Sequence, residues 1–429
     1  MNKHDLIWLR LDNAAKIYPA AQRRDWSNIF RLSVTLTQPV DAAVLQQALD
    51  KTVPRFPSIA ARLRKGLFWY YLQQLDHAPE LREESTHPLT RMSRREMRKC
   101  ALRVIVYDRR IALELFHSLT DGNGALVFLK TLTAEYLRRK YGISVPPEEG
   151  ILDLSEAPQP EELEDSFLKY GGNIQASRRS NDAWRIRSEP ETDGFLNLTC
   201  FRMPTQAVLD AAHAHGVSAT AFLTACMMMA LQQLQAERIP IRRFRKNIKV
   251  LIPVNLRKLF PSKTLRNFVM FTSPEIFPRL GEYDFDEICR IVHHRMGLDI
   301  TPKHMSTLIA ANIRGERIGA VRVIPLFLKN LIMKAVFDTV GERKSCLSLS
   351  NLGQVQLPDA MRPYVERFDL ILGVQASAPY NCGVISYGDH LYLNLIRNTH
   401  DPLLENHFFR VLQQHRVPVQ VQSNRGERS

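Results

Sequence analysis

The stretch FHSLTDG at residues 116–122 is the part of this sequence that decides its fold. Before it, residues 102–116 contain two apolar stretches on either side of a polar turn, which predicts a β-hairpin. After it, the large apolar side chains of residues 126–137 recur at helical spacing, and the turn formers at 121–124 separate strand from helix. We therefore expect His117 at the end of a strand, just before a tight turn.

His117 is suited to proton abstraction, because an unperturbed imidazole has a pKa of about 6.5. Asp121 follows it by four residues across a turn, so its carboxylate need not touch the ring and can instead hold the loop through an ion pair. In a chain with 13 histidines the bare pattern arises easily by chance, and a surface histidine beside a turn aspartate is the alternative. The strand before, the glycines between and the helix after favour a functional histidine.

The composition is that of a globular protein. The 429 residues suit two ordinary domains or one large one, with 45% hydrophobic and 24% charged residues. The start of the chain is polar and predicts no signal peptide, and no apolar run reaches the length of a membrane-spanning helix. Six cysteines without a Cys-x-x-Cys pair predict neither a zinc knuckle nor a disulfide framework, and hence a cytoplasmic location.

Two halves of the chain share the same order of elements. Residues 30–36 alternate apolar and polar, which predicts a half-buried strand with a helix behind it, and residues 195–201 begin a similar strand–helix order. The segment between them is rich in proline, acidic residues and glycine. These patterns predict an N-terminal lobe at 1–150, a crossover linker at 151–193 and a C-terminal lobe at 194–429.

The motif formed by His117, Asp121 and Gly122 resembles the His-x-x-x-Asp-Gly signature of the CoA-dependent acyltransferases with the chloramphenicol acetyltransferase fold. That superfamily includes alcohol acyltransferases, wax ester synthases, plant BAHD enzymes and the condensation domains of peptide synthetases. The resemblance implies an α/β fold of two similar lobes with a central tunnel at their interface. It also implies that His117 is the general base and that Asp121 is mainly structural.

Two further segments carry the same resemblance. Residues 253–257, Pro-Val-Asn-Leu-Arg, are similar to a segment of the wax ester synthase and alcohol acyltransferase branch, and this implies that Arg257 is the ion-pair partner of Asp121. Residues 348–353 are similar to a strand end near the tunnel wall in the same branch.

At two places the sequence differs from particular branches of this superfamily. Residues 368–373 do not match the Asp-Phe-Gly-Trp-Gly motif of the plant enzymes, which argues against that branch. Phe116 stands where the condensation domains have a second histidine, which weakens a dependence on a carrier protein without removing it.

We expect an acyltransferase that moves an acyl group from acyl-CoA, as co-substrate, to a small-molecule alcohol or amine, with His117 as general base. The developing oxyanion needs a hydrogen-bond donor, and the candidate donors are Asn267, Thr272, Ser348 and Asn351. No bound cofactor and no metal is expected, since the adjacent pair His293 and His294 lacks a further ligand at helical spacing. The alternatives are a free-standing condensation-type protein that uses a carrier-protein thioester, and a non-catalytic two-lobed binding protein.

The net charge of +14 raises the question of an anionic partner. The basic residues are spread along the chain without a recognised RNA or DNA motif, so nucleic acid is not expected. CoA, with its phosphates, is a second candidate for an anionic partner, and acidic membrane lipid is a third. The apolar stretch 321–340 is interleaved with Arg322, Lys329 and Lys334 and leaves a membrane-surface contact open. Its helical spacing favours a core or a tunnel lining instead, through Val323, Leu326, Phe327, Leu331 and Val336.

Overall fold

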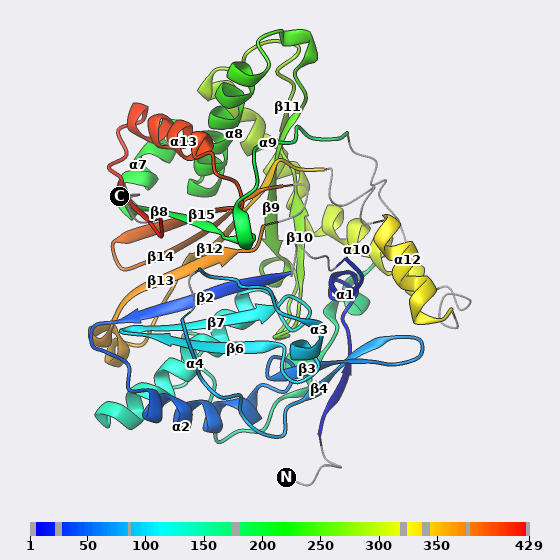
Figure 1. Ribbon diagram of the computed structural model, residues 1–429, viewed down its shortest axis with the longest axis vertical. Helices are drawn as coiled ribbons and strands as arrows, with labels where there is room; N and C mark the ends of the chain where they lie inside the picture. Colours follow the sequence, from blue (N-terminus) through cyan, green and yellow to red (C-terminus); the bar gives the residue numbers. More distant parts are fainter. Residues whose placement is uncertain are drawn as a thin grey trace.

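The structure is a computed structural model that describes residues 6–21, 28–84, 87–172, 181–317, 324–336, 344–374 and 378–425. Two β-sheets, each with helices on its outer side, form a lower and an upper lobe in Figure 1. A small third sheet and the helices α1, α10 and α12 lie to the right of them in the same view.

The lower lobe is a five-stranded sheet with two long helices packed on one face. The apolar side chains of its central strands and of both helices belong to one continuous buried core. The order of the strands in the sheet is β13 (Val365–Leu372), β2 (Ile29–Leu36), β7 (Arg110–Phe116), β6 (Leu102–Tyr107) and β5 (Arg82–Glu83), and the helices are α2 (Ala42–Thr52) and α4 (Gly122–Tyr141). The hairpin and the helix predicted around the FHSLTDG stretch are confirmed.

The second face of this sheet is buried too, so the prediction of a half-buried strand at 30–36 is wrong. Arg31 and Ser33 are each only 2% exposed. The Arg31 guanidinium lies 2.7 Å from the Glu114 carboxylate and 2.6 Å from that of Glu84. The polar residues of this alternating pattern are therefore buried, and they can be buried because the charged side chains neutralise one another.

The upper lobe is an eight-stranded sheet covered by helices. The strand–helix order predicted from residue 195 onward is confirmed, and Ser218 caps the longest of these helices as expected. The strands, in sheet order, are β10 (Val269–Thr272), β9 (Ile248–Asn255), β12 (Leu347–Gln354), β14 (Tyr380–Tyr387), β15 (His390–Arg397), β8 (Asn197–Pro204) and β16 (Gln420–Ser423), with β11 (Glu275–Ile276) on β9. The helices are α7 (Thr205–Ala214), α8 (Ala219–Arg238), α9 (Phe285–Asp299) and α13 (Leu403–Gln414).

Strand β13 joins the two lobes. It belongs to the second half of the sequence but pairs along its length with β2 of the lower lobe. Next to it, a Cβ atom added to Gly383 on β14 would lie 2.3 Å from the carbonyl oxygen of Leu370, so only glycine allows this close approach. The division into 1–150, 151–193 and 194–429 stays a prediction, and β13 is a segment of the last range that lies in the sheet of the first.

The remaining elements connect and flank the lobes. Phe167 and Trp184, from the expected linker, are buried in two different cores and so fasten it on both sides. These elements are β1 (Trp8–Arg10), β4 (Tyr70–Gln74) and β3 (Ala61–Lys65) in the small sheet, with α1 (Ile17–Ala21), α3 (Arg94–Met97), α5 (Pro160–Leu163), α6 (Ser166–Tyr170), α10 (Pro302–Arg317) and α12 (Leu326–Val336). Short 3-10 helices are η2 (Val53–Arg55), η3 (Thr192–Gly194), η4 (Arg242–Phe244), η5 (Leu256–Lys258) and η7 (Asp359–Tyr364).

Helix α12 makes up most of the described part of the apolar stretch 321–340, which is 324–336. Val323 and the side chain of Val336, both expected in the core, lie outside what the structure describes. Leu326 is buried, as a core position should be, but Phe327 is 66% and Leu331 68% exposed, so the core interpretation is wrong for these two. Among the helices that the structure describes, none is long and apolar enough to cross a membrane alone, and only the bent pair α7–α8 meets those criteria when its members are taken together.

Candidate active site

His117 directly follows β7, where the sequence predicted it, and its ring is held by two aromatic neighbours. The backbone N–H of His117 donates to the carbonyl oxygen of Asn28 over 2.9 Å. The imidazole stacks on Tyr18 of α1, with ring centroids 4.7 Å apart and planes 18° apart, and lies 4.9 Å from the ring of Phe30. These contacts fix the plane in which the imidazole lies.

The ring nitrogen Nδ1 has a specific partner. It lies 3.2 Å from Oδ1 of Asn267, and Nδ2 of the same amide donates over 3.2 Å to the Asp12 carboxylate. Because a carboxylate accepts hydrogen bonds, the Asn267 amide must turn its N–H group to Asp12 and its oxygen to His117. An oxygen at Nδ1 requires that Nδ1 carry the proton, which leaves Nε2 with the free lone pair of a base.

Burial determines the electrostatics of this group. It lowers the pKa of His117 below its ordinary value, although Asp121, Asn267 and Asp12 oppose the shift. The imidazole is therefore neutral at pH 7, as a general base must be. Asp12 is fully buried, which raises its pKa, while the Arg266 guanidinium 3.8 Å away and the N–H donors around it favour its ionised form.

Asp121 turns away from His117 and serves the backbone and an arginine. Its Oδ1 accepts from the N–H groups of Asn123 and Gly124, each over 3.1 Å, and thereby caps the start of α4. Its Oδ2 accepts from Arg257 over 2.8 Å and from the backbone N–H of Phe268 over 2.9 Å. The predicted ion pair between Asp121 and Arg257 is present.

The Arg257 guanidinium makes one hydrogen bond to Asp121 rather than the two-pronged contact that its shape allows. Its Nε donates over 2.9 Å to the carbonyl oxygen of Thr264, and its Nη2 donates to that of Arg266. Asp121 binds the backbone at Phe268, so the ion pair holds the chain on both sides of Asn267. The pair therefore determines where the partner of His117 lies.

The three motifs found in the sequence meet at this point. A Cβ atom added to Gly122 would lie 2.8 Å from a methyl group of Leu352, so the motif turn packs directly on the 348–353 segment. Asn255 of the 253–257 segment donates to Asn123 over 3.5 Å.

Of the four expected oxyanion donors, Asn267 is the one whose side chain lies against His117. The contacts of the other three lead into the upper lobe. Thr272 donates to Asp299 of α9, the backbone N–H of Ser348 donates over 2.9 Å to Oδ1 of Asn381, and Asn351 donates to Thr220 over 3.0 Å. Whether any of them faces the substrate stays a prediction.

Three contributors to the site were missed by sequence reasoning, namely Asp12, Tyr18 and Asn28. Asp12 and Asn267 are 255 residues apart, so no local pattern connects them. A lone aspartate just after the apolar run 6–9 is the only signal that the sequence offered, and it is a common feature.

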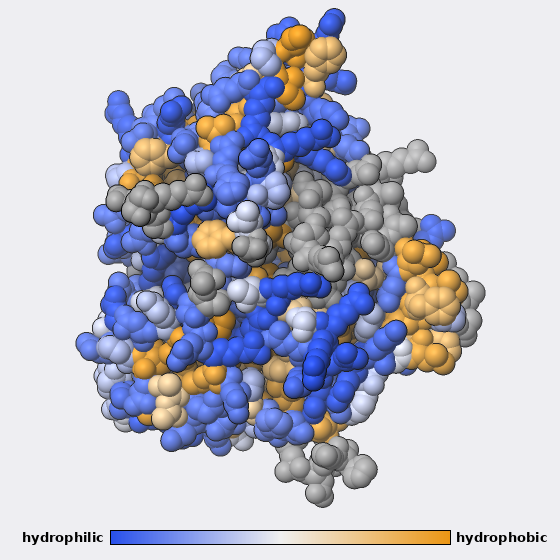
Figure 2. Space-filling model, in the orientation of Figure 1, coloured by the Kyte–Doolittle hydropathy of each residue, from blue (hydrophilic) through white to orange (hydrophobic). Residues whose placement is uncertain are grey.

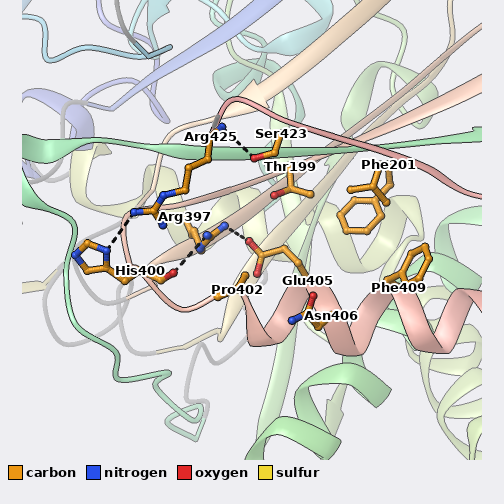
Figure 3. Close-up of a pocket in the computed structure, with 11 residues that line it drawn as sticks. Thr199, Phe201, Arg397, His400, Pro402, Glu405, Asn406, Phe409, Ser423 and Arg425 are labelled. Carbon is orange, nitrogen blue, oxygen red and sulfur yellow. Dashed lines mark hydrogen bonds and ion pairs between the residues drawn. The ribbon is translucent and has the colours of Figure 1, made fainter. Parts of the chain in front are cut away.

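A cavity of about 740 Å³ lies elsewhere, between β8, β16 and α13 of the upper lobe. Figure 3 shows that its polar side chains face one another: Arg397 pairs with Glu405, and His400 meets Arg425. None of the site residues expected from the sequence lines it. Within the described ranges, no group of three or more histidine, cysteine, aspartate or glutamate side chains could hold a metal ion.

No family model matches the sequence, and neither does any curated protein. Solved structures do match over nearly the whole chain. TRI101 of Fusarium sporotrichioides, solved with coenzyme A and T-2, has a TM-score of 0.61 at 10% identity, over 97% of this chain and 100% of that one. The first condensation domain of the calcium-dependent antibiotic synthetase, solved with a substrate analogue, has a TM-score of 0.58 at 14% identity, over 96% and 99%.

A third match is the wax ester synthase/diacylglycerol acyltransferase of Marinobacter aquaeolei VT8, with a TM-score of 0.54 at 15% identity, over 95% of this chain and 99% of that one. These likenesses, together with the two sheets and the strand β13 between them, confirm the predicted two-lobed α/β fold, and the central tunnel stays a prediction. The chain has the two-lobed α/β fold of the chloramphenicol acetyltransferase-like acyltransferases and condensation domains.

Proposed function

We propose that this chain is an acyltransferase that moves an acyl group from acyl-CoA to an alcohol or amine, with His117 as general base. The observation that carries the proposal is the imidazole fixed by Asn267 at Nδ1, neutral through burial, with Nε2 left free. This is the state that a base needs before it can take a proton from a hydroxyl or an amine.

In the proposed reaction, Nε2 of His117 takes the acceptor's proton as the acceptor oxygen or nitrogen attacks the thioester carbonyl. The tetrahedral intermediate then collapses, the carbon–sulfur bond breaks, and the thiolate leaves with the proton from His117. The oxyanion needs a donor between these steps. Asn267 has a second N–H beyond the one it gives to Asp12, and Thr272, Ser348 and Asn351 stay the other proposed donors.

The donor and the route by which substrates enter are proposals as well. The likeness to a structure solved with coenzyme A and to a wax ester synthase supports acyl-CoA, and the net charge of +14 suits its phosphates. A central tunnel between the lobes would let donor and acceptor approach His117 from opposite sides. The condensation domain among the similar structures keeps a carrier-protein thioester as the alternative donor. We also propose a cytoplasmic location.

An acceptor screen that measures thiol release tests this function. Acetyl-CoA and long-chain acyl-CoA are each offered with a panel of alcohols and amines, and the folded His117→Ala protein serves as control. Acceptor-dependent release that disappears in the control would support the proposal. Turnover only with a phosphopantetheinylated carrier would instead establish the condensation-type alternative, and a folded protein that turns over neither donor would be the non-catalytic binding protein.

A further inference from the structure

Helix α12 exposes an apolar face that a protein surface rarely leaves uncovered. Its opposite face is buried through Leu326 and Lys329, each 4% exposed. The exposed fractions on the outer face are 66% for Phe327, 41% for Leu328, 68% for Leu331 and 55% for Ile332. Figure 2 shows a hydrophobic area at the right-hand edge of the molecule, where Figure 1 places α12.

The tip of the β3–β4 hairpin extends this face. Leu67 is 73% and Phe68 37% exposed. The backbone N–H of Leu326 donates to the carbonyl oxygen of Leu67 over 3.0 Å, and Nζ of Lys329 donates to that of Phe68 over 3.1 Å. Helix and hairpin are thus tied into one surface, the α12 patch, which consists of Leu67, Phe68, Phe327, Leu328, Leu331 and Ile332.

Three segments that form or flank the patch carry charge of one sign in the sequence. Residues 63–72 of the hairpin, 13–21 around α1 and 326–336 of α12 contain no aspartate or glutamate. Besides the buried Lys329, they contain the basic residues Lys16, Arg64, Lys65 and Lys334. An apolar area among basic residues is complementary to an anionic lipid surface, where acyl chains take up the apolar side chains and headgroups attract the basic ones. A second copy of the chain fits less well, because it would bring two positively charged surrounds together.

The patch also lies close to the candidate active site. Helix α12 packs against α1, and α1 carries Tyr18, which stacks on the ring of His117. A bilayer that meets the α12 patch would therefore lie one short helix away from the proposed base.

We propose that the α12 patch docks this protein on the surface of an anionic lipid bilayer, with α12 lying in the interface and not crossing it. The apolar side chains would enter the boundary between headgroups and acyl chains, as the exposed face of an amphipathic helix does. The grounds are the exposed apolar side chains of the patch and the basic residues beside it, so this docking does not depend on the proposed acyl transfer.

Flotation of the full chain with vesicles tests it without any activity assay. Vesicles of phosphatidylcholine alone are compared with vesicles that also contain phosphatidylglycerol. We expect the chain to float with the anionic vesicles, more weakly as salt is raised. The double variant Phe327→Ser and Leu331→Ser should lower the partition coefficient about tenfold or more, because each removed side chain no longer leaves water.

The matched control is the double variant Leu280→Ser and Leu298→Ser, whose leucines are 69% and 72% exposed but lie outside the patch. It should bind vesicles like the parent, and circular dichroism should show both variants folded. Failure of the folded parent to float with any vesicle would overturn the proposal, as would an equal loss of binding in the control. Light scattering without lipid adds a further arm: a dimer that dissociates in the patch variant would assign the surface to a second copy instead.

Discussion

Two aspartates lie near His117, and they act on it in different ways. Asp121 belongs to the visible motif but directs its carboxylate to the start of α4, to Arg257 and to the backbone at Phe268. Asp12 belongs to no motif, yet it binds the side chain of Asn267, whose oxygen meets the imidazole. Asp121, which is visible in the sequence motif, supports the backbone. Asp12, which no motif indicates, supports the base.

Both carboxylates act on one amide, that of Asn267. Arg257 holds the carbonyl oxygen of Arg266 and Asp121 holds the N–H of Phe268, so the backbone on both sides of Asn267 is fixed. Asp12 then sets the rotation of the Asn267 side chain. We infer that Asp121 places Asn267, that Asp12 orients it, and that His117 depends on both.

The largest effect should come from removal of the base itself. His117→Ala should lower kcat by about 10² to 10⁴-fold, the usual contribution of general-base catalysis. The substitution removes a half-buried ring that makes no ion pair, so the protein should stay folded. Steady-state kinetics together with a thermal melt check this, and a folded variant that retains turnover would show that neither aspartate supports a catalytic histidine.

Asp121→Ala and Arg257→Ala should each cost roughly 3–5 kcal/mol of unfolding free energy, because each leaves a buried charge without its partner. The two side chains are 2% and 10% exposed. Denaturant unfolding of both single variants and the double variant should show strong coupling between the positions.

Asp121→Asn is the control for this pair, since asparagine still caps a helix but cannot neutralise Arg257. It should lose less stability than Asp121→Ala. Additive effects at positions 121 and 257, or an Asp121→Ala protein as stable as its parent, would contradict the structural role and return Asp121 to a direct role on His117.

Loss of the contact between Asp12 and Asn267 should have a smaller effect on turnover than loss of the base itself. Asp12→Ala should lower kcat about tenfold, the equivalent of one hydrogen bond that keeps the proton on Nδ1, and Asn267→Ala should lower kcat at least as much, because it also removes a proposed oxyanion donor. Nitrogen NMR of the imidazole should show a mixture of tautomers in both variants and one tautomer in the parent.

Asn394→Ala is the matched control, because Asn394 is equally buried and donates to an aspartate, Asp369, over 2.9 Å in another part of the molecule. It should leave the tautomer unchanged. A single tautomer in Asn267→Ala would mean that another group orients His117.

Much of this fold could be predicted because it depends on local patterns. The hairpin, the helix after Asp121 and the strand–helix order from residue 195 rest on periodicity and capping, which neighbouring residues supply. The Asp121–Arg257 pair was accessible only through the resemblance of two short motifs. Asp12 and Tyr18 were not accessible, since their roles arise from packing between segments that are distant along the chain. The burial of Arg31 was missed for the same reason, because its partner Glu114 lies on another strand.

The smallest expected effect is a displacement of the pH profile, and it tests the environment that both aspartates share. Burial lowers the pKa of His117 below 6.5, so the imidazole stays neutral, and competent as a base, to a lower pH than a free histidine would. The acidic limb of kcat against pH should therefore have its midpoint below 6.5. The same shift affects stability with a defined sign: the unfolded chain binds the proton more readily, so the stability linked to His117 is full above the unfolded pKa and is lost as pH falls through it. Asp12→Asn should move the kinetic midpoint further toward acid, because Asp12 favours the charged imidazole. A midpoint at or above 6.5 in the parent would show that the charges of Asp121 and Asp12 outweigh burial, and that the imidazole has a more polar environment than its aromatic neighbours provide.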